Sequence, residues 1–182
     1  MTDSVLFYGL GSMGTGMAHS LRRAGFRVNA FTNKPEVRQA FIDAGGESTD
    51  LAAFAPKATA VVIAVVNAAQ TEDILFSSTG LAERLPDGCV VIACPTIDPA
   101  DARRFEAACE AQGLLYLDAP ISGGALKAET GALSFMASGR PEAFAAAQPF
   151  LDAMGGTAVR RVGRSQALPG NLDDTTVITV MQ

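Results

Sequence analysis

The amino-acid sequence predicts an α/β fold of the doubly wound type, built on a mainly parallel β-sheet. Short apolar segments of strand length alternate along the chain with segments whose apolar residues recur every three or four positions. Residues 60–66 form a continuous apolar run rich in β-branched side chains, which is typical of a strand buried on both faces of a parallel sheet. This alternation predicts right-handed crossovers between neighbouring parallel strands.

The first half of the chain supplies two strand–helix pairs. Residues 5–8 are apolar and predict a short strand, and a second strand is expected at residues 26–32. The helix between them has apolar residues at helical spacing and ends near Gly25, which can adopt the conformation that closes a helix. The second helix begins at Pro35, a residue suited to a first helical position, and ends at the glycines at 45–46.

The second half continues the same alternation. Asp98 and Pro99 form a strong helix start, because an aspartate side chain caps the first turn and proline suits the position after it. That helix stops at Gly113, and another is expected over residues 141–154. Further strands are expected at residues 89–94, 114–117, 133–138 and 157–162.

Composition narrows the class of protein. The 182 residues are 48% hydrophobic and 18% charged, which fits one globular domain, and the net charge of −5 offers no basic surface for nucleic acid or an anionic membrane. No apolar run has the length of a membrane span, and the start of the chain, with Asp3, does not look like a signal peptide. Cys89, Cys94 and Cys109 have no metal-ligand spacing and are expected as buried thiols, so we expect no metal site and a cytoplasmic location.

A glycine-rich loop lies directly between the first strand and the first helix. In Gly9-Leu10-Gly11-Ser12-Met13-Gly14, the first glycine makes the turn, the second lets a pyrophosphate approach the backbone, and the third lets helix and strand pack closely. Free N–H groups and the positive end of the helix dipole would hold the phosphates. A bare turn is the alternative, but the strand–loop–helix context favours a Rossmann-type dinucleotide site.

The end of the second strand favours NADP as the cofactor, with NAD as the alternative. An acidic residue there would bind the adenosine ribose and repel a 2′-phosphate, yet the segment reads Thr32-Asn33-Lys34. Asn33 can bind ribose or phosphate oxygens, and Lys34 can offset the additional charge. Lys34 as a solvated side chain is the competing interpretation.

Three motifs resemble the β-hydroxyacid dehydrogenase family, which includes 3-hydroxyisobutyrate dehydrogenase. The glycine loop, continued by Gly16-Met17-Ala18, is similar to the family's cofactor signature. Residues 91–99 resemble the segment that ends under the nicotinamide, and residues 118–136 resemble the substrate-binding signature. The resemblance covers residues 4–163, and residues 66–72 together with Lys127 are most similar to the L-threonate dehydrogenase branch.

The resemblance implies an NAD(P)-dependent oxidoreductase that transfers a hydride between nicotinamide and a small 3-hydroxy acid. It places Val66, Asn67 and Thr96 at the cofactor, with Thr96 near the reacting carbon. It also assigns the substrate carboxylate to the Ser122 hydroxyl and to the backbone N–H groups of Gly123 and Gly124. From the residues alone, the segment 122–124 would be interpreted as a flexible loop.

The chain departs from the family after residue 163. The family places a lysine, its general acid/base, on a long helix there, but residues 164–182 hold no lysine and favour a strand over 175–180. We therefore divide the chain into a binding domain at 1–163 and an atypical tail at 164–182, and we assign no catalytic residue. We expect cofactor binding with little or no turnover.

Several origins of this pattern stay open: a truncated or frameshifted enzyme, a natural short protein, or a module completed by another chain. A non-catalytic dinucleotide-binding or interaction module is the alternative function. An apolar patch where the family's helical domain docks would favour a homo-oligomer.

Overall fold

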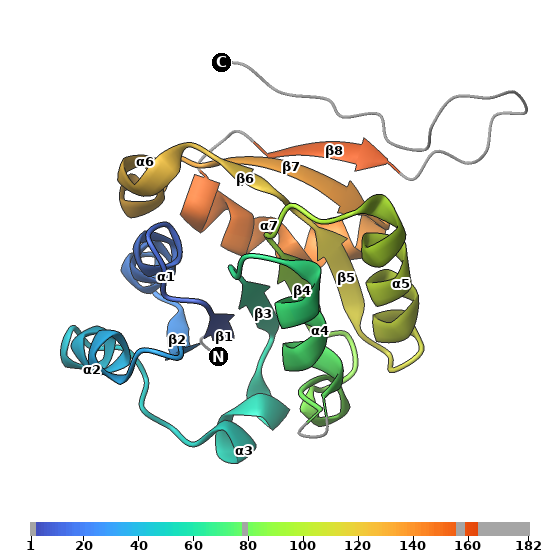
Figure 1. Ribbon diagram of the computed structural model, residues 1–182. Coiled ribbons are helices and arrows are strands. Elements are labelled where there is room, and N and C mark those ends of the chain that lie inside the picture. The colour runs from blue at the N-terminus through green and yellow to red at the C-terminus, as the bar shows by residue number, and fades with distance from the viewer. Residues whose placement is uncertain (1–2, 78–79, 156–158, 164–182) are drawn as a thin grey trace, which may run out of the picture.

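The computed structural model describes residues 3–77, 80–155 and 159–163, and its strands form one sheet (Figure 1). The strands are β1 Ser4–Tyr8, β2 Arg27–Phe31, β3 Ala60–Ile63, β4 Val90–Ala93, β5 Leu115–Asp118, β6 Ile121–Ser122, β7 Ser134–Gly139 and β8 Val159–Gly163. Their order is β2-β1-β3-β4-β5-β7-β6, with β8 paired to β7. Strands β1 to β5 run parallel, which confirms the predicted doubly wound sheet.

Helices cover both faces of this sheet (Figure 1). They are α1 Gly14–Arg23, α2 Pro35–Asp43, α3 Leu51–Phe54, α4 Ala68–Phe76, α5 Pro99–Glu110, α6 Gly124–Thr130 and α7 Pro141–Gly155, with 3-10 turns η1 Ala55–Lys57 and η2 Ala82–Arg84. Helices α1, α2, α6 and α7 contribute to one apolar core, and α3, α4 and α5 contribute to the other. None of the described helices has both the length and the hydropathy needed to cross a membrane.

The two cores explain the unbroken apolar strands. Successive side chains of a strand point to opposite faces, so Val5 and Phe7 of β1 enter one core while Leu6 enters the other. Val61 and Val62 of β3 divide in the same way, and all five side chains are fully buried. A strand flanked by helices on both sides has no face left for polar residues.

One strand prediction needs correction. β3 ends at Ile63, so residues 64–66 do not continue the strand, and the side chain of Val66 is 80% exposed. The strand expected at 133–138 is confirmed as β7, which runs antiparallel to β5. Parallel pairing returns between β7 and β8, the strand expected at 157–162, whose first two residues lie outside the described part.

Helices α3, α4 and α6 were not predicted. The segment 122–124 is not an irregular loop, because Ser122 ends β6 and Gly123 leads directly into α6. The predicted caps were correct at α5, where the Asp98 carboxylate accepts a hydrogen bond from the Ala100 N–H at 2.7 Å. The tail at 164–182, with its expected strand at 175–180, lies outside the described residues.

Candidate cofactor-binding site

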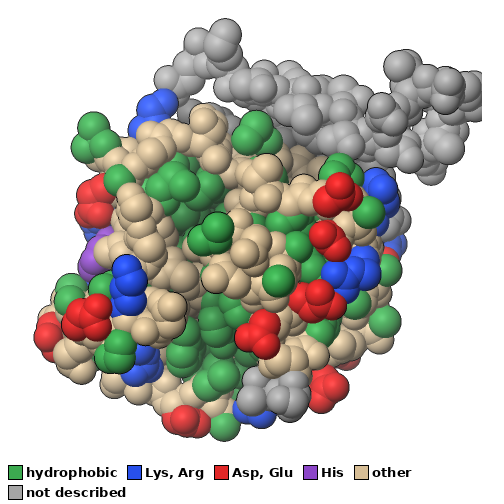
Figure 2. Space-filling view, viewed as in Figure 1, with side chains coloured by type: hydrophobic (Ala, Val, Ile, Leu, Met, Phe, Trp, Pro, Cys, Tyr) green, Lys and Arg blue, Asp and Glu red, His purple; other side chains and the backbone are tan. Residues whose placement is uncertain are grey.

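A cavity of about 770 Å³ opens at the carboxyl ends of β1, β2 and β3, where the order in which successive strands join the sheet reverses. β1 and β3 are neighbours, but the connection that leaves β1 passes through α1 on one face of the sheet, whereas the connection that leaves β3 passes through α4 on the other face. In open α/β sheets, ligands bind at such a switch point, beyond the carboxyl ends of the strands. The residues that follow β1, β2 and β3 line this cavity together with α4, and its volume is that of a small-molecule site. Figure 2 shows the molecular surface from the direction of Figure 1, with hydrophobic side chains lining a recess in its lower centre.

The glycine loop bounds the cavity, and its three glycines have different surroundings. Gly9 has φ +101°, and a Cβ there would collide with the Ala64 carbonyl oxygen of the neighbouring segment. A Cβ on Gly14 would collide with the Gly9 carbonyl oxygen, so this position requires glycine for the contact between helix and loop. A Cβ on Gly11 would meet no protein atom within 4 Å.

Gly11 is therefore the informative position. Among the glycines whose surroundings the structure describes, it alone combines a φ outside the left-handed region with open space at the Cβ position. Neither backbone strain nor protein packing requires glycine there. A ligand that approaches the backbone closely would require it, which is the role of the second glycine in dinucleotide-binding loops.

The start of α1 is suited to an anion. The backbone N–H groups of Gly11, Ser12 and Met13 have no hydrogen-bond acceptor among the described residues. The first turn of α1 carries no acidic side chain, while Arg22 and Arg23 occupy its last turn. The positive end of the helix dipole is thus unneutralised beside the cavity, and unpaired amides with this dipole form a phosphate-binding arrangement.

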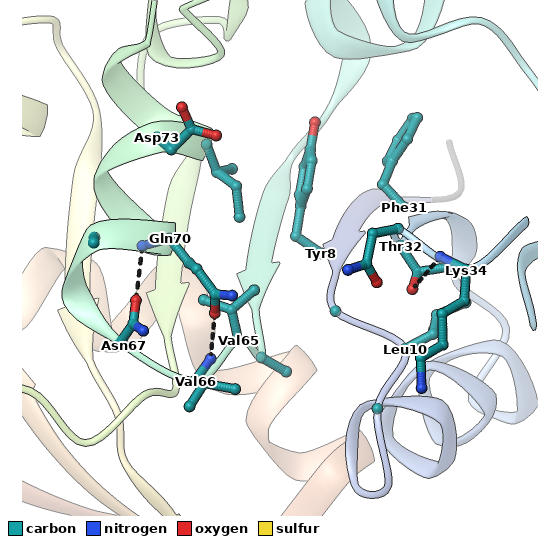
Figure 3. A pocket seen from close by; sticks show the side chains of 16 residues that line it. Tyr8, Leu10, Phe31, Thr32, Lys34, Val65, Val66, Asn67, Gln70 and Asp73 are labelled. Atoms are coloured by element: carbon teal, nitrogen blue, oxygen red, sulfur yellow. Dashed lines mark hydrogen bonds between the residues drawn. The ribbon is translucent and has the colours of Figure 1, made fainter.

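The wall beyond β2 carries two of the predicted residues. Asn33 and Lys34 are exposed and line the cavity. The Lys34 backbone N–H donates to the Thr32 hydroxyl at 3.3 Å, and Lys34 precedes Pro35 at the start of α2 (Figure 3). No carboxylate occurs between Thr32 and Pro35 to repel a phosphate at this wall.

The opposite wall is formed by the β3–α4 connection (Figure 3). The Asn67 side-chain oxygen accepts from the Gln70 N–H at 2.9 Å and caps α4, and the Gln70 side-chain oxygen accepts from the Val66 N–H at 2.9 Å. Val66 and Asn67 both line the cavity, and the Asn67 side-chain oxygen is engaged within the protein. Asn67 would therefore affect a ligand through the shape of the β3–α4 connection, and not through a direct hydrogen bond from this oxygen.

Sequence reasoning missed the aromatic residues of the site. Tyr8 and Phe31 line the cavity, and their rings stack with centroids 5.1 Å apart and planes inclined by 20°. Burial raises the pKa of the Tyr8 hydroxyl to about 12, with Arg84 opposing the shift, so the hydroxyl stays neutral. Both residues end neighbouring parallel strands, and that placement could have identified them, because such strands end at the same edge of the sheet.

The remaining predicted residues do not line this cavity. Ser12, Met13 and Gly14 lie in the glycine loop and at the start of α1, and Thr96 follows β4 and is exposed. The segment 122–124 follows β5 by way of β6 and is exposed. β4 and β5 are adjacent and parallel, with Ala93 opposite Asp118, so Thr96 and this segment leave the same edge of the sheet, farther from β1.

Helix α6 is fixed against α1. A Cβ on Gly16 would come within 2.6 Å of the Glu129 backbone nitrogen, so the two helix backbones approach closely only because this residue is glycine. The Ser20 hydroxyl donates to the Ala128 carbonyl at 2.9 Å, and Arg23 pairs with Glu129 at 3.1 Å. The helix that carries the glycine loop is thereby joined to the helix that follows Ser122.

A buried polar group lies beneath the same edge. Asp118 ends β5, and its Oδ1 and the Tyr116 hydroxyl have no hydrogen-bond partner among the described residues. Burial, with a smaller contribution from the Glu106 carboxylate, raises the pKa of the Asp118 carboxyl to about 7. All three cysteines are free and buried, as expected, and burial raises the pKa of both Cys89 and Cys109 to about 12.

Comparison with known proteins agrees with this geometry. Residues 4–163 match the family model described as the NAD binding domain of 6-phosphogluconate dehydrogenase. An L-threonate dehydrogenase of Cupriavidus necator is 43% identical over 161 residues, covering 88% of this chain and 54% of the relative. A 3-hydroxyisobutyrate dehydrogenase of Pseudomonas aeruginosa is 40% identical, covering 85% of this chain and 52% of the relative.

Solved structures give the same result. The crystal structure of 3-hydroxyisobutyrate dehydrogenase from Salmonella typhimurium superimposes with a TM-score of 0.82 at 40% identity, over 88% of this chain and 56% of that chain. The chain spans about half the length of the curated relatives that it matches. These relatives confirm the resemblance to the hydroxyacid dehydrogenases. The chain thus belongs to the family defined by the NAD-binding domain of 6-phosphogluconate dehydrogenase.

Proposed function

We propose that this chain is the cofactor-binding part of an oxidoreductase that prefers NADP and acts on a small 3-hydroxy acid. Residues 1–163 form the binding domain, and residues 164–182 are a separate tail. The nicotinamide group of the bound cofactor would supply the hydride acceptor. The open position at Gly11 carries the proposal: neither backbone strain nor packing requires glycine there, whereas the close approach of a diphosphate to the backbone would.

The glycine loop holds the diphosphate in this proposal. The N–H groups of Gly11, Ser12 and Met13 donate to it, and Gly9 and Gly14 maintain the loop that presents them. The adenosine half lies in the cavity between the wall beyond β2 and the β3–α4 connection. The cavity walls there include Leu10, Val66 and Asn67.

NADP preference follows from the wall beyond β2. Lys34 supplies positive charge and Asn33 supplies hydrogen bonds where a 2′-phosphate would lie, and the segment Thr32-Asn33-Lys34 holds no acidic residue. Relatives occur with each cofactor: one from Pseudomonas aeruginosa, 38% identical, is named NAD-dependent L-serine dehydrogenase, and a solved relative, 30% identical with a TM-score of 0.80, is in complex with NADP+.

The substrate subsite is assigned to the adjoining edge of the sheet. Thr96 lies after β4, toward the nicotinamide end, and Ser122 offers a hydroxyl to the substrate carboxylate. Gly123 and Gly124 have φ of +140° and +74°, backbone conformations in which successive N–H groups can form an anion-binding concavity. Relatives named for L-threonate and 3-hydroxyisobutyrate, both hydroxy acids, support this class of substrate.

Catalysis needs a group that we do not find in this chain. The family resemblance implies a lysine after residue 163, and residues 164–182 hold none. A positioned acid or base contributes about 10²- to 10⁴-fold to a rate. We therefore assign the chain binding roles only.

Calorimetric titration of the 182-residue chain with NADP+ and with NAD+ tests the proposal. We expect saturable binding of both cofactors at one site per chain, with the lower Kd for NADP+. Absence of binding for both would overturn the proposal. A lower Kd for NAD+ would overturn the NADP preference and leave the dinucleotide site intact.

A further inference from the structure

The helix that follows Ser122 carries a lysine whose stem packs on the segment 122–124. Lys127 lies in the middle of α6, and a Cβ built on Gly123 would come within 2.9 Å of the Lys127 Cδ and 3.0 Å of its Cβ. The side chain therefore runs back along α6 toward Gly123, the direction in which helix side chains point. Only the Cε methylene separates Cδ from the ammonium, so the positive charge stays near the start of α6.

The two glycines before Lys127 have different surroundings. The Lys127 stem and the Leu133 side chain, with its Cδ2 at 3.1 Å, fill the space into which a Cβ on Gly123 would point. A Cβ on Gly124 would meet no protein atom within 4 Å. One side of the segment 122–124 is therefore closed by the lysine stem, and the space beside Gly124 is open to a ligand.

The charge of Lys127 is not compensated by the described side chains. None of their carboxylates forms an ion pair with it. Glu129, the acidic residue of α6, pairs instead with Arg23 at 3.1 Å, and the segment 122–124 holds no acidic residue. A positive charge therefore lies beside the hydroxyl and the backbone N–H groups of this segment, and a carboxylate is a ligand that all of them can bind.

We infer that Lys127 is a substrate-binding residue whose ammonium forms an ion pair with the carboxylate of the hydroxy acid held at the segment 122–124. This inference rests on the proposed function, and it adds a charged side chain to a subsite otherwise built from one hydroxyl and two backbone N–H groups. The ion pair also sets specificity, because a neutral derivative of the same acid leaves the ammonium without a partner. The substrate class is therefore the free hydroxy acid and not its amide or ester.

The test is an amide NMR titration of the 182-residue chain, saturated with NADP+, with 3-hydroxyisobutyrate and with its amide. We expect the acid to shift the backbone signals of Gly123 and Gly124 saturably, and the amide to bind more weakly. Lys127→Met keeps an unbranched stem and removes the charge, so it should raise the Kd for the acid about fivefold, the effect of losing an exposed ion pair. The Kd for the amide should stay unchanged, and the loss for the acid should shrink at high ionic strength.

The controls separate this inference from the proposed function. Lys57→Met removes an exposed charge from η1, at the amino end of β3 and so at the opposite edge of the sheet, and should leave the Kd for the acid unchanged. An unchanged Kd for the acid in Lys127→Met, or equal weakening of acid and amide, would overturn the inference.

The Kd for NADP+ distinguishes the remaining outcomes. It should be the same in Lys127→Met as in the unmodified chain, and a rise would place Lys127 at the cofactor phosphates and overturn the inference. If the unmodified chain binds NADP+ but the acid shifts neither Gly123 nor Gly124, the substrate subsite and this inference fail while the cofactor site stands. If it does not bind NADP+, the proposed function fails with them.

Discussion

Substitution of Gly11 by alanine should abolish tight cofactor binding without harming the fold. A Cβ at this position would meet no protein atom within 4 Å, and the backbone is outside the left-handed region. We expect the free energy of unfolding to change by no more than about 1 kcal/mol, and the change can be favourable because alanine restricts the unfolded chain. The new methyl group would occupy the space through which a diphosphate reaches the loop.

The loss in binding can be sized from the hydrogen bonds involved. A hydrogen bond to a charged group contributes about 1.5–3 kcal/mol. Displacing the diphosphate from even one N–H would therefore raise the Kd for NADP+ by roughly 10- to 100-fold. Calorimetric titration measures this Kd, and thermal unfolding of the same sample measures stability.

Gly14→Ala is the matched comparison. Its Cβ would collide with the Gly9 carbonyl oxygen, and overpacking of this kind costs about 1–3 kcal/mol. The two variants should therefore separate: Gly11→Ala loses binding and keeps its Tm, whereas Gly14→Ala has a lowered Tm. The reasoning is refuted if Gly11→Ala binds NADP+ as the unmodified chain does, or if it is the less stable of the two.

Three further predictions address the rest of the chain. Gly16→Ala should lower the free energy of unfolding by about 1–3 kcal/mol, and the Tm with it, because its Cβ would overpack the contact between α1 and the Glu129 backbone. An unchanged melting curve would contradict this contact. Asp118 binds its proton more tightly in the folded state, with a pKa of about 7, so stability should fall as pH rises from about 4 to about 7. One pKa unit corresponds to about 1.4 kcal/mol, so Asp118→Asn should be more stable than the unmodified chain at pH 8 by up to roughly 4 kcal/mol. Chemical denaturation across this pH range measures the difference. If the Asp118 carboxyl were solvated, the substitution would give no such gain. The purified chain with NADP+ and L-threonate or 3-hydroxyisobutyrate should form almost no NADPH at 340 nm, and turnover at ordinary enzyme rates would refute the assignment of binding roles only.

Short sequence motifs were sufficient to predict the elements whose ends are set by one or two characteristic residues. The glycine loop between an apolar strand and a helix, the proline at the start of α2 and the Asp98–Pro99 start of α5 all specify structure through one or two residues. Each of these was predicted correctly. The continuous apolar strands also identified a sheet covered on both faces.

Elements that depend on tertiary contacts were not predictable in this way. α6 has only seven residues, and it is held by the close approach of Gly16 and by the Ser20 hydroxyl, 108 residues away from its partner. The antiparallel direction of β7 follows from the short β6 and α6 that precede it, which the sequence did not indicate. Val66 continues an apolar run, so periodicity alone could not show that the strand ends at Ile63.

The candidate site shows the same division. The glycine loop and Lys34 were found because their residue types point to phosphate binding. Tyr8 and Phe31 became candidates only when the sheet order placed the ends of β1 and β2 beside one cavity.

A crystal structure of the chain grown with NADP+ would test the central claim most directly. We predict that the two bridging phosphates lie against the start of α1, with their oxygens within hydrogen-bond distance of the N–H groups of Gly11, Ser12 and Met13. A nucleotide bound elsewhere on the sheet, or one whose phosphates contact side chains alone, would contradict the account.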